Sequence, residues 1–291
     1  MRSVAAELVE RREIVPGQWL HAWHAPGVVS GARAGQYVHL RTIEPGGLPV
    51  RRPLAIATAD PASGTLTTQA SGELPARAGA GQAWTQSLRV GDRTELMGPL
   101  GRPFEVDPRS RHLLLVAEEG ALGALRLLVD EAIREGRSVV LLYGARSSSH
   151  VYPSSLLPDE VEYVVATADG SLGHHGAVID LVRDYEAWAD QSFAAGPSRL
   201  LGDLARLAAG RRQRMGVATL GRKRGGGRPV VAGSPEARRK SFLQVAPGQA
   251  IGCAAGTCLG CTVMGSAGIP LRVCREGPAF AAGELALDGD A

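Results

Sequence analysis

The sequence of 291 residues has no cysteine before residue 253 and no apolar run that approaches the length of a membrane span. Its opening stretch, MRSVAAELVERREIV, is charged throughout, so we expect neither a signal peptide nor a transmembrane helix. The default compartment is then the cytoplasm. In a reducing compartment, four clustered cysteines are expected to be metal ligands rather than two disulfides.

The chain also lacks a large overall charge, because its net charge is only +3. Residues 211–240 hold ten Arg or Lys and one acid, Glu236, which leaves 22 bases and 28 acids elsewhere. Gly and Pro interrupt this segment, and no aromatic residues are interleaved for stacking on bases. We therefore interpret it as a basic linker or insertion rather than a nucleic-acid arm, with docking onto an acidic partner subunit left open.

The sequence gives little indication of a hydrolase active site or of a metal site with histidine ligands. His21 and His24 form no metal triad, and His174 and His175 lie in a polar turn, GSLGHHG, typical of solvated loops. The serines of residues 147–150 lack a nucleophile elbow.

Residues 1–108 alternate short apolar runs with turn residues, while helical periodicity is weak. This pattern predicts a small antiparallel β-barrel. The predicted strands are QYVHLRT, RRPLAIATAD, GTLTTQAS and DRTELMGP.

Residues 109–210 change to alternating strands and helices. RHLLLVA reads as a buried strand, and the following helix places Leu122, Leu125, Val129 and Ala132 on one face before it ends at Gly136. Further buried strands, SVVLLYGAR, VEYVVATAD and QSFAAGP, alternate with helix-compatible stretches. The alternation predicts a Rossmann-like α/β domain with a parallel sheet, followed by the basic segment and a small domain over 241–291.

The four cysteines of this tail have the spacing C-x4-C-x2-C-x12-C. They are Cys253, Cys258, Cys261 and Cys274. Structural zinc sites usually contain two C-x2-C pairs, whereas C-x4-C-x2-C with a distant fourth cysteine is the plant-type [2Fe-2S] arrangement. Gly252, Gly256 and Gly260 would let the backbone turn and point N–H groups at the inorganic sulfides of a cluster. We predict a [2Fe-2S] cluster, with a zinc knuckle as the alternative.

The tail CAAGTCLGCTV…RVCREGPAF resembles the cluster domain of the electron-transfer subunit of dihydroorotate dehydrogenase. Other motifs resemble that family in the same order, and only residues 211–240 have no counterpart. They are GQYVHLRT, RRPLAIA, GPLGRPF, TADGSLGHHGAVIDL and AAGPSRLL. The resemblance implies a ferredoxin-reductase-like flavoprotein with an FAD-binding barrel, an NAD-binding-like α/β domain and a [2Fe-2S] tail.

For FAD, the resemblance points to the segment Arg52, Pro53, Leu54 and Ala55. A guanidinium such as that of Arg52 can bind a diphosphate bidentately, while proline stiffens the strand. Ala55 stands where the family has a hydroxyl residue. The family's G-x-G-T phosphate turn corresponds to Gly79, Gly81 and Gln82, where glutamine replaces threonine.

The nicotinamide motif departs further from the family, whose glycine-rich turn is replaced here by AEEGALGAL. Glu118 and Glu119 place carboxylates where dinucleotide phosphates would lie, and Ala195 replaces the family's cysteine. Gly120 and Gly196 persist as backbone positions for NAD(H). We therefore expect no direct oxidation of NADH.

The resulting hypothesis is an oxidoreductase subunit that passes electrons between FAD, the cluster and a partner flavoprotein or oxidoreductase in a hetero-oligomer. The partner most like the family's is the catalytic subunit of dihydroorotate dehydrogenase; hydrogenases and transhydrogenases stay open. The alternative is a non-enzymatic assembly subunit with a structural zinc or iron-sulfur site. No substrate pocket, nucleic-acid site or membrane contact is expected.

Overall fold

The N-terminal part of the chain forms a closed antiparallel barrel. The computed structural model describes residues 2–43, 49–71, 87–214 and 234–287. The barrel order is β1-β2-β5-β4-β3-β6, which confirms the predicted flavin-type barrel. Its strands are β1 (Arg2–Val15), β2 (Gln18–His24), β3 (Tyr37–Ile43), β4 (Pro49–Asp60), β5 (Thr65–Ser71) and β6 (Arg93–Leu100), with a short helix α1 (Pro26–Val29) after β2.

The barrel encloses an apolar core because alternate side chains of each strand point inward. The fully buried side chains include Leu8, Trp23, Leu40, Ile56, Leu66 and Leu96. Burying large apolar side chains of this kind stabilises the fold by about 1.5–3 kcal/mol each.

The second part is the predicted parallel α/β layer. Its strands are β7 (His112–Glu118), β8 (Ser138–Ala145), β9 (Glu162–Thr167), β10 (His174–His175) and β11 (Gln191–Gly196); its helices are α3 (Gly123–Arg134), α4 (Val178–Tyr185) and α5 (Ser198–Arg214), with 3-10 turns η1 (Ser148–His150) and η2 (Ser154–Leu156). As predicted, α3 buries Leu125, Val129 and Ala132, and Gly136 follows it with a φ of +70°. No helix in the described ranges is long and apolar enough to cross a membrane.

The C-terminal part does not begin as a separate unit, because its first strand joins the α/β sheet. The strand β12 (Leu243–Pro247) pairs in parallel with β11, and β15 (Phe280–Ala281) pairs antiparallel with β12. The seven-stranded order is β10-β9-β8-β7-β11-β12-β15. The other elements are α6 (Pro235–Arg239), β13 (Thr262–Met264), β14 (Pro270–Arg272), α7 (Val273–Glu276) and η3 (Ala282–Glu284).

The basic segment predicted as a linker is helical at both described ends. Residues 211–214 form the end of α5, and residues 235–239 form α6. The remainder, 215–233, lies outside the described residues.

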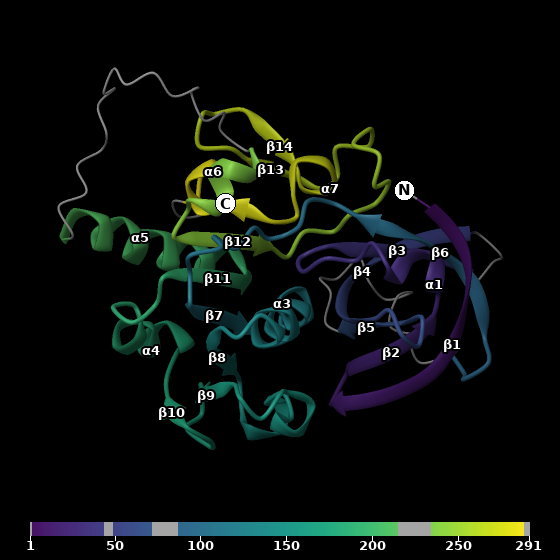
Figure 1. Cartoon of the computed structure of the whole chain (residues 1–291), viewed down its shortest axis with the longest axis horizontal. Helices are drawn as coiled ribbons and strands as arrows, with labels where there is room; N and C mark the ends of the chain where they lie inside the picture. The colour runs from purple at the N-terminus through teal and green to yellow at the C-terminus, as the bar shows by residue number, and fades with distance from the viewer. Residues whose placement is uncertain (1, 44–48, 72–86, 215–233, 288–291) are drawn as a thin grey trace.

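Figure 1 shows how these parts meet. The barrel lies on one side, the parallel sheet with α4 and α5 on the other, and the C-terminal segment runs over both. The cysteine-bearing loop is thereby held against the barrel as well as the sheet.

Two histidines inside the barrel make the fold sensitive to acid. His21 and His39 have no exposed surface, and burial, aided by Arg11 and Arg51 respectively, lowers the pKa of each to about 4. Histidine in the unfolded chain titrates near 6.5, so the unfolded state takes up protons first as the pH falls. Stability is therefore full above about pH 6.5 and declines toward pH 4 by about 3 kcal/mol per histidine.

The measurement is urea unfolding between pH 7 and pH 4. We expect the variant His21→Leu to lose part of this acid sensitivity, and the same substitution of the exposed His24 to leave it unchanged. An identical pH dependence in all three proteins would contradict the assignment.

Candidate functional site

The four cysteines come together in the C-terminal segment as two interacting pairs. Cys253 interacts with Cys258, and the N–H of Cys274 lies 3.5 Å from the Sγ of Cys261. The two pairs are close enough for Cys253 to affect the pKa of Cys274. No three Cys, His, Asp or Glu side chains in the described part of the chain gather as ligands of a single metal ion. Pairing of this kind suits a [2Fe-2S] cluster, in which each iron takes two thiolates, better than a tetrahedral zinc.

The loop that carries the first three cysteines is tightly turned. Ala254 and Leu259 both have positive φ values, +54° and +56°, which residues other than glycine seldom adopt. Of the three glycines predicted to permit the turn, only Gly256 has a left-handed φ, at +79°. Gly252 and Gly260 have no left-handed φ, and a Cβ at either would make only an ordinary van der Waals contact of 3.6 Å with the Sγ of Cys258. Backbone strain in this loop is thus found at residues other than glycine, as is common at functional sites.

Backbone N–H groups point at the sulfur atoms of two cysteines. The N–H of Ala255 lies 3.4 Å from the Sγ of Cys253, and that of Gly260 lies 3.5 Å from the Sγ of Cys258. Hydrogen bonds, the largest from the N–H of Cys258, lower the pKa of Cys253 to about 5. Burial raises the pKa of Cys274. The loop therefore favours thiolate on its outer side, which is the ligand form.

Arg272 clamps this loop to the short helix α7. Its guanidinium binds both carboxylate oxygens of Glu276, at 2.6 and 3.1 Å, and lies 3.4 Å from the carbonyl of Gly256. Bidentate pairs of this kind fix orientation as well as charge. Sequence reasoning did not find Arg272, although its position two residues before the fourth cysteine is a usable signal.

Two motifs far apart in the sequence meet at the barrel edge. The N–H of Arg102, in GPLGRPF, donates to the carbonyl of Gly277, in REGPAF, at 2.6 Å. Gly101 has a φ of +79°, and a Cβ there would overlap Pro278 and come within 3.0 Å of Tyr37 Cε1. Only glycine fits this approach of two backbones.

Tyr37 links the cluster loop to the strand predicted for FAD. Its buried hydroxyl donates to the carbonyl of Cys274 at 3.5 Å, and burial raises its pKa. In the register of β3 and β4, Tyr37 lies opposite Ala55. From the sequence, Tyr37 was predicted only as part of a strand. No local pattern could predict its contact with Cys274, because the two residues are 237 positions apart.

The predicted FAD segment lies on β4. Arg52, Pro53 and Ala55 are half-buried, and Leu54 is buried. Beside them, Oε1 of Gln69, which pairs in register with Ala55, is buried without a hydrogen-bond partner. An acceptor left open in this way suits an amphipathic ring with N–H groups, such as a flavin. Gly79, Gly81 and Gln82 lie outside the described residues.

The dinucleotide motif lies at the carboxyl ends of β7 and β11. Gly120, with a φ of +81°, turns the chain from β7 into α3, and Gly196 ends β11. Glu118 forms an ion pair with Arg199 at 2.6 Å, and Glu119 forms one with Arg146 at 2.7 Å. Burial raises the pKa of Glu118, and Arg199 opposes that effect.

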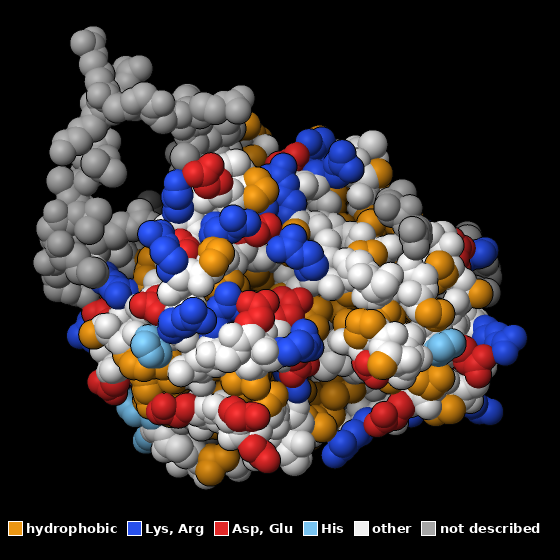
Figure 2. Space-filling view, viewed as in Figure 1, with side chains coloured by type: hydrophobic (Ala, Val, Ile, Leu, Met, Phe, Trp, Pro, Cys, Tyr) orange, Lys and Arg blue, Asp and Glu red, His pale blue; other side chains and the backbone are white. Residues whose placement is uncertain are grey.

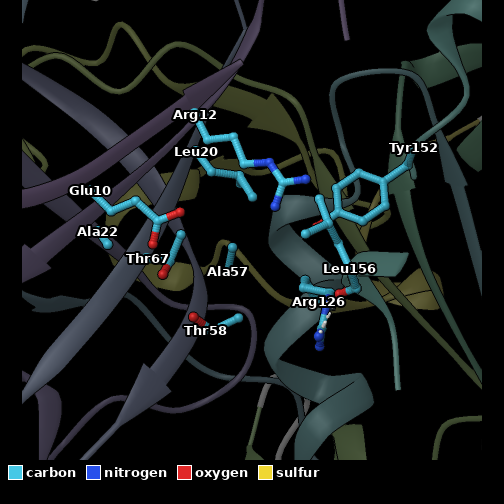
Figure 3. A pocket seen from close by; sticks show the side chains of 10 residues that line it. All are labelled: Glu10, Arg12, Leu20, Ala22, Ala57, Thr58, Thr67, Arg126, Tyr152 and Leu156. Atoms are coloured by element: carbon cyan, nitrogen blue, oxygen red, sulfur yellow. Dashed lines mark hydrogen bonds between the residues drawn. The ribbon is translucent and has the colours of Figure 1, made fainter. Parts of the chain in front are cut away.

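A separate cavity of about 200 Å³ lies between the barrel and the α/β layer. In Figure 3, barrel side chains such as Leu20 and Ala57 form one wall, and Arg126, Tyr152 and Leu156 come from the opposite side. None of the predicted site residues that the structure describes lines it.

Comparison with known proteins connects this geometry to a family. Residues 249–286 match the family model for the iron-sulfur cluster binding domain of dihydroorotate dehydrogenase B. The chain is 28% identical over 257 residues to the dihydroorotate dehydrogenase B (NAD(+)) electron transfer subunit of Geobacillus thermodenitrificans, covering 87% of this chain and 86% of that protein. Over most of its length the chain is similar to these electron-transfer subunits. The resemblance predicted from the motifs is confirmed.

Other comparisons agree over nearly the whole chain. The corresponding subunit of Shouchella clausii is 27% identical, with 88% of this chain and 87% of that protein covered. A chain of the NADH-dependent reduced ferredoxin-NADP oxidoreductase has the same fold, with a TM-score of 0.73, 21% identity and coverage of 97% of this chain and 90% of that one.

The packing of Gly256 leads to a test of the cluster loop. A Cβ at Gly256 would lie 2.7 Å from Cγ of Arg275 and 3.1 Å from Nη1 of Arg272. We expect Gly256→Ala to lose more than about half of the bound iron and sulfide, because it displaces the clamp and strains the turn by about 1–2 kcal/mol. Iron and acid-labile sulfide analysis measures this.

The matched control is Gly268→Ala in the same segment. Gly268 has a similar φ, +72°, but nothing lies within 4 Å of an added Cβ. The Gly268→Ala variant should retain its cluster. If both variants lost iron and sulfide equally, backbone strain alone would explain the loss in Gly256→Ala.

The barrel junction gives a second test. Gly101→Ala should loosen the contact with residues 277–278 and destabilise it by about 1–3 kcal/mol, as overpacking does. Hydrogen exchange of the backbone around residues 277–281 should speed up. Gly91→Ala, with a φ of +94° and open space around it, provides the control. Unchanged exchange in Gly101→Ala would mean that the contact does not hold the segment.

Proposed function

We propose that this chain transfers electrons between an FAD bound on the barrel and a [2Fe-2S] cluster held by the four cysteines, and exchanges them with a partner oxidoreductase. The observation that carries the proposal is the position of Tyr37. It lies opposite Ala55 of the predicted flavin strand and donates to the carbonyl of Cys274. One side chain is thus the common neighbour of both candidate sites.

Different residues of the chain would hold the two cofactors. Arg52 would bind the diphosphate of FAD, Pro53 would stiffen the strand, and Ala55 would face the flavin, while the side chain of Leu54 packs in the barrel core beneath them. When bound, FAD accepts two electrons together and releases them singly, while the cluster carries one at a time. The protein's own part is to hold four thiolates, keep those of Cys261 and Cys274 away from water and fix their distance from the barrel.

The proposed partner is a catalytic subunit of the dihydroorotate dehydrogenase type, in a hetero-oligomer in the cytoplasm. The relatives are named as electron transfer subunits of dihydroorotate dehydrogenase B, which supports this choice. Cys258 and its neighbour Leu259 are exposed, the latter by 62%, whereas Cys261 and Cys274 are buried. An exposed edge on one side of the site suits electron transfer to a second protein.

The test is spectroscopic. As purified, the protein should carry one flavin released by acid and about two irons and two sulfides, given four thiolate ligands. After reduction it should give a [2Fe-2S] paramagnetic resonance signal. Cys258→Ala should lose that signal and keep its flavin, because the barrel residues are untouched, while Ser266→Ala in the same segment should retain both.

Two outcomes would contradict the proposal. Stoichiometric zinc in a colourless protein would favour the assembly-subunit alternative. A cluster that stays oxidised when the flavin in the same chain is reduced by light would show that the two sites do not exchange electrons.

A further inference from the structure

The parallel sheet has one place where a dinucleotide would be expected to bind. From β7 the chain proceeds to β8 and β9 on one side of the sheet, and then returns to β11 and β12 on the other. In such sheets ligands bind outside the carboxyl ends of the strands at this switch point, with phosphates at the first helix N-terminus. Here that is the crevice between the ends of β7 and β11, next to the start of α3.

Two ion pairs occupy this crevice. Glu118 is the last residue of β7, and its carboxylate binds Arg199, in the first turn of α5 directly after β11. That pair therefore spans the switch point itself. Glu119 binds Arg146, the residue after β8, with three N–O distances between 2.7 and 3.2 Å. That pair spans the gap on the other side of β7.

In both ion pairs the carboxylate is more buried than the arginine that it binds. The side chains of Glu118 and Glu119 are only 15% and 17% exposed, whereas those of Arg199 and Arg146 are 68% and 49% exposed. A diphosphate approaching the start of α3 would reach two arginines that are already neutralised by largely buried carboxylates. Removing the arginines from these carboxylates would leave their charges unpaired, which is costly in a partly buried site.

Two backbone donors at this turn are also engaged. The N–H of Glu119 donates to the carbonyl of Gly144, and that of Ala121 donates to the carbonyl of Glu118. Phosphate binding at a helix start depends on such groups being free to point at the ligand. In charge and in hydrogen bonding, the residues at this crevice do not fit a dinucleotide diphosphate.

We propose that Glu118 and Glu119 are specificity-determining residues that close the crevice to NAD(H), so that this chain exchanges its electrons with protein partners alone. The inference deepens the proposed function, since it rests on a chain that carries electrons but has lost the entry point for a dinucleotide. It differs from the named activity of the relatives, which belong to dihydroorotate dehydrogenases of the NAD(+) type.

The test measures NADH binding to the flavin-loaded and cluster-loaded protein by quenching of dihydronicotinamide fluorescence. The wild type should show no saturable binding at submillimolar NADH. The double variant Glu118→Gln/Glu119→Gln keeps the shape of both side chains and removes both negative charges. It should bind NADH at least about tenfold more tightly than the wild type.

Two further variants separate charge from general loosening. Glu7→Gln/Glu236→Gln removes two carboxylates from exposed ion pairs with Arg93 and Lys240, outside the crevice, and should not change NADH binding. Arg146→Gln/Arg199→Gln opens the same pairs but leaves the carboxylates, and it should not gain binding either. A gain in this arginine variant equal to that of the glutamine variant would overturn the role of the carboxylates.

Saturable wild-type binding of NADH in the micromolar range would overturn the proposal without any variant. So would a correctly folded Glu118→Gln/Glu119→Gln protein with no gain in affinity. Neither result depends on the resonance signal of the cluster. Failure of this inference is therefore distinguishable from failure of the proposed electron-transfer function.

Discussion

The contact between the barrel loop after β6 and the turn after the last cysteine is the constraint on which the rest of the candidate site depends. Gly101 permits it, the N–H of Arg102 donates across it, and Gly277 and Pro278 form its other side. This contact sets the position of the cysteine loop beside β3, and the apolar cluster shared by Tyr37, Ile251 and Cys261 supports it. With it, the Tyr37 hydroxyl reaches the carbonyl of Cys274. Electron transfer between two cofactors depends on such a fixed relation, because a small change in the spacing of reacting groups has a large effect on rate.

The α/β layer also supports the cysteine loop, and its ion pairs restrict what can bind at the carboxyl ends of its strands. Strand β12 continues the sheet from β11 and then leads into the cysteine loop, so the sheet anchors the tail from one side while the barrel holds it from the other. Figure 2 shows Lys and Arg side chains gathered over the upper part of this face, around the C-terminal segment. At the carboxyl ends of β7 and β11, the ion pairs of Glu118 and Glu119 fill the crevice that such a sheet normally offers to a ligand. The layer therefore serves as a scaffold for electron transfer while its own ligand crevice is occupied by side chains.

Local patterns explain why much of this could be predicted. The apolar face of α3 follows from a 3.6-residue period, and the barrel strands follow from short runs bounded by turn residues. The cysteine spacing carried the cluster prediction because ligands on one loop are close in sequence as well as in space. By contrast, residues 243–247 were expected in the tail domain, because a five-residue strand such as LQVAP does not indicate which sheet it joins. The left-handed Ala254 and Leu259 were also missed, because a loop held by its surroundings can impose conformations that its residues do not prefer.

The sequence by itself determined the cofactor class, the order of the parts and the loss of glycines from the dinucleotide turn, because each of these depends on residue types at short, fixed spacings. Only the tertiary structure decided that Glu118 and Glu119 find Arg199 and Arg146, and that Tyr37 meets Cys274. These contacts join residues tens to hundreds of positions apart. They exist because sheet pairing and barrel closure bring those positions together, and no local pattern records which distant neighbour a side chain will have.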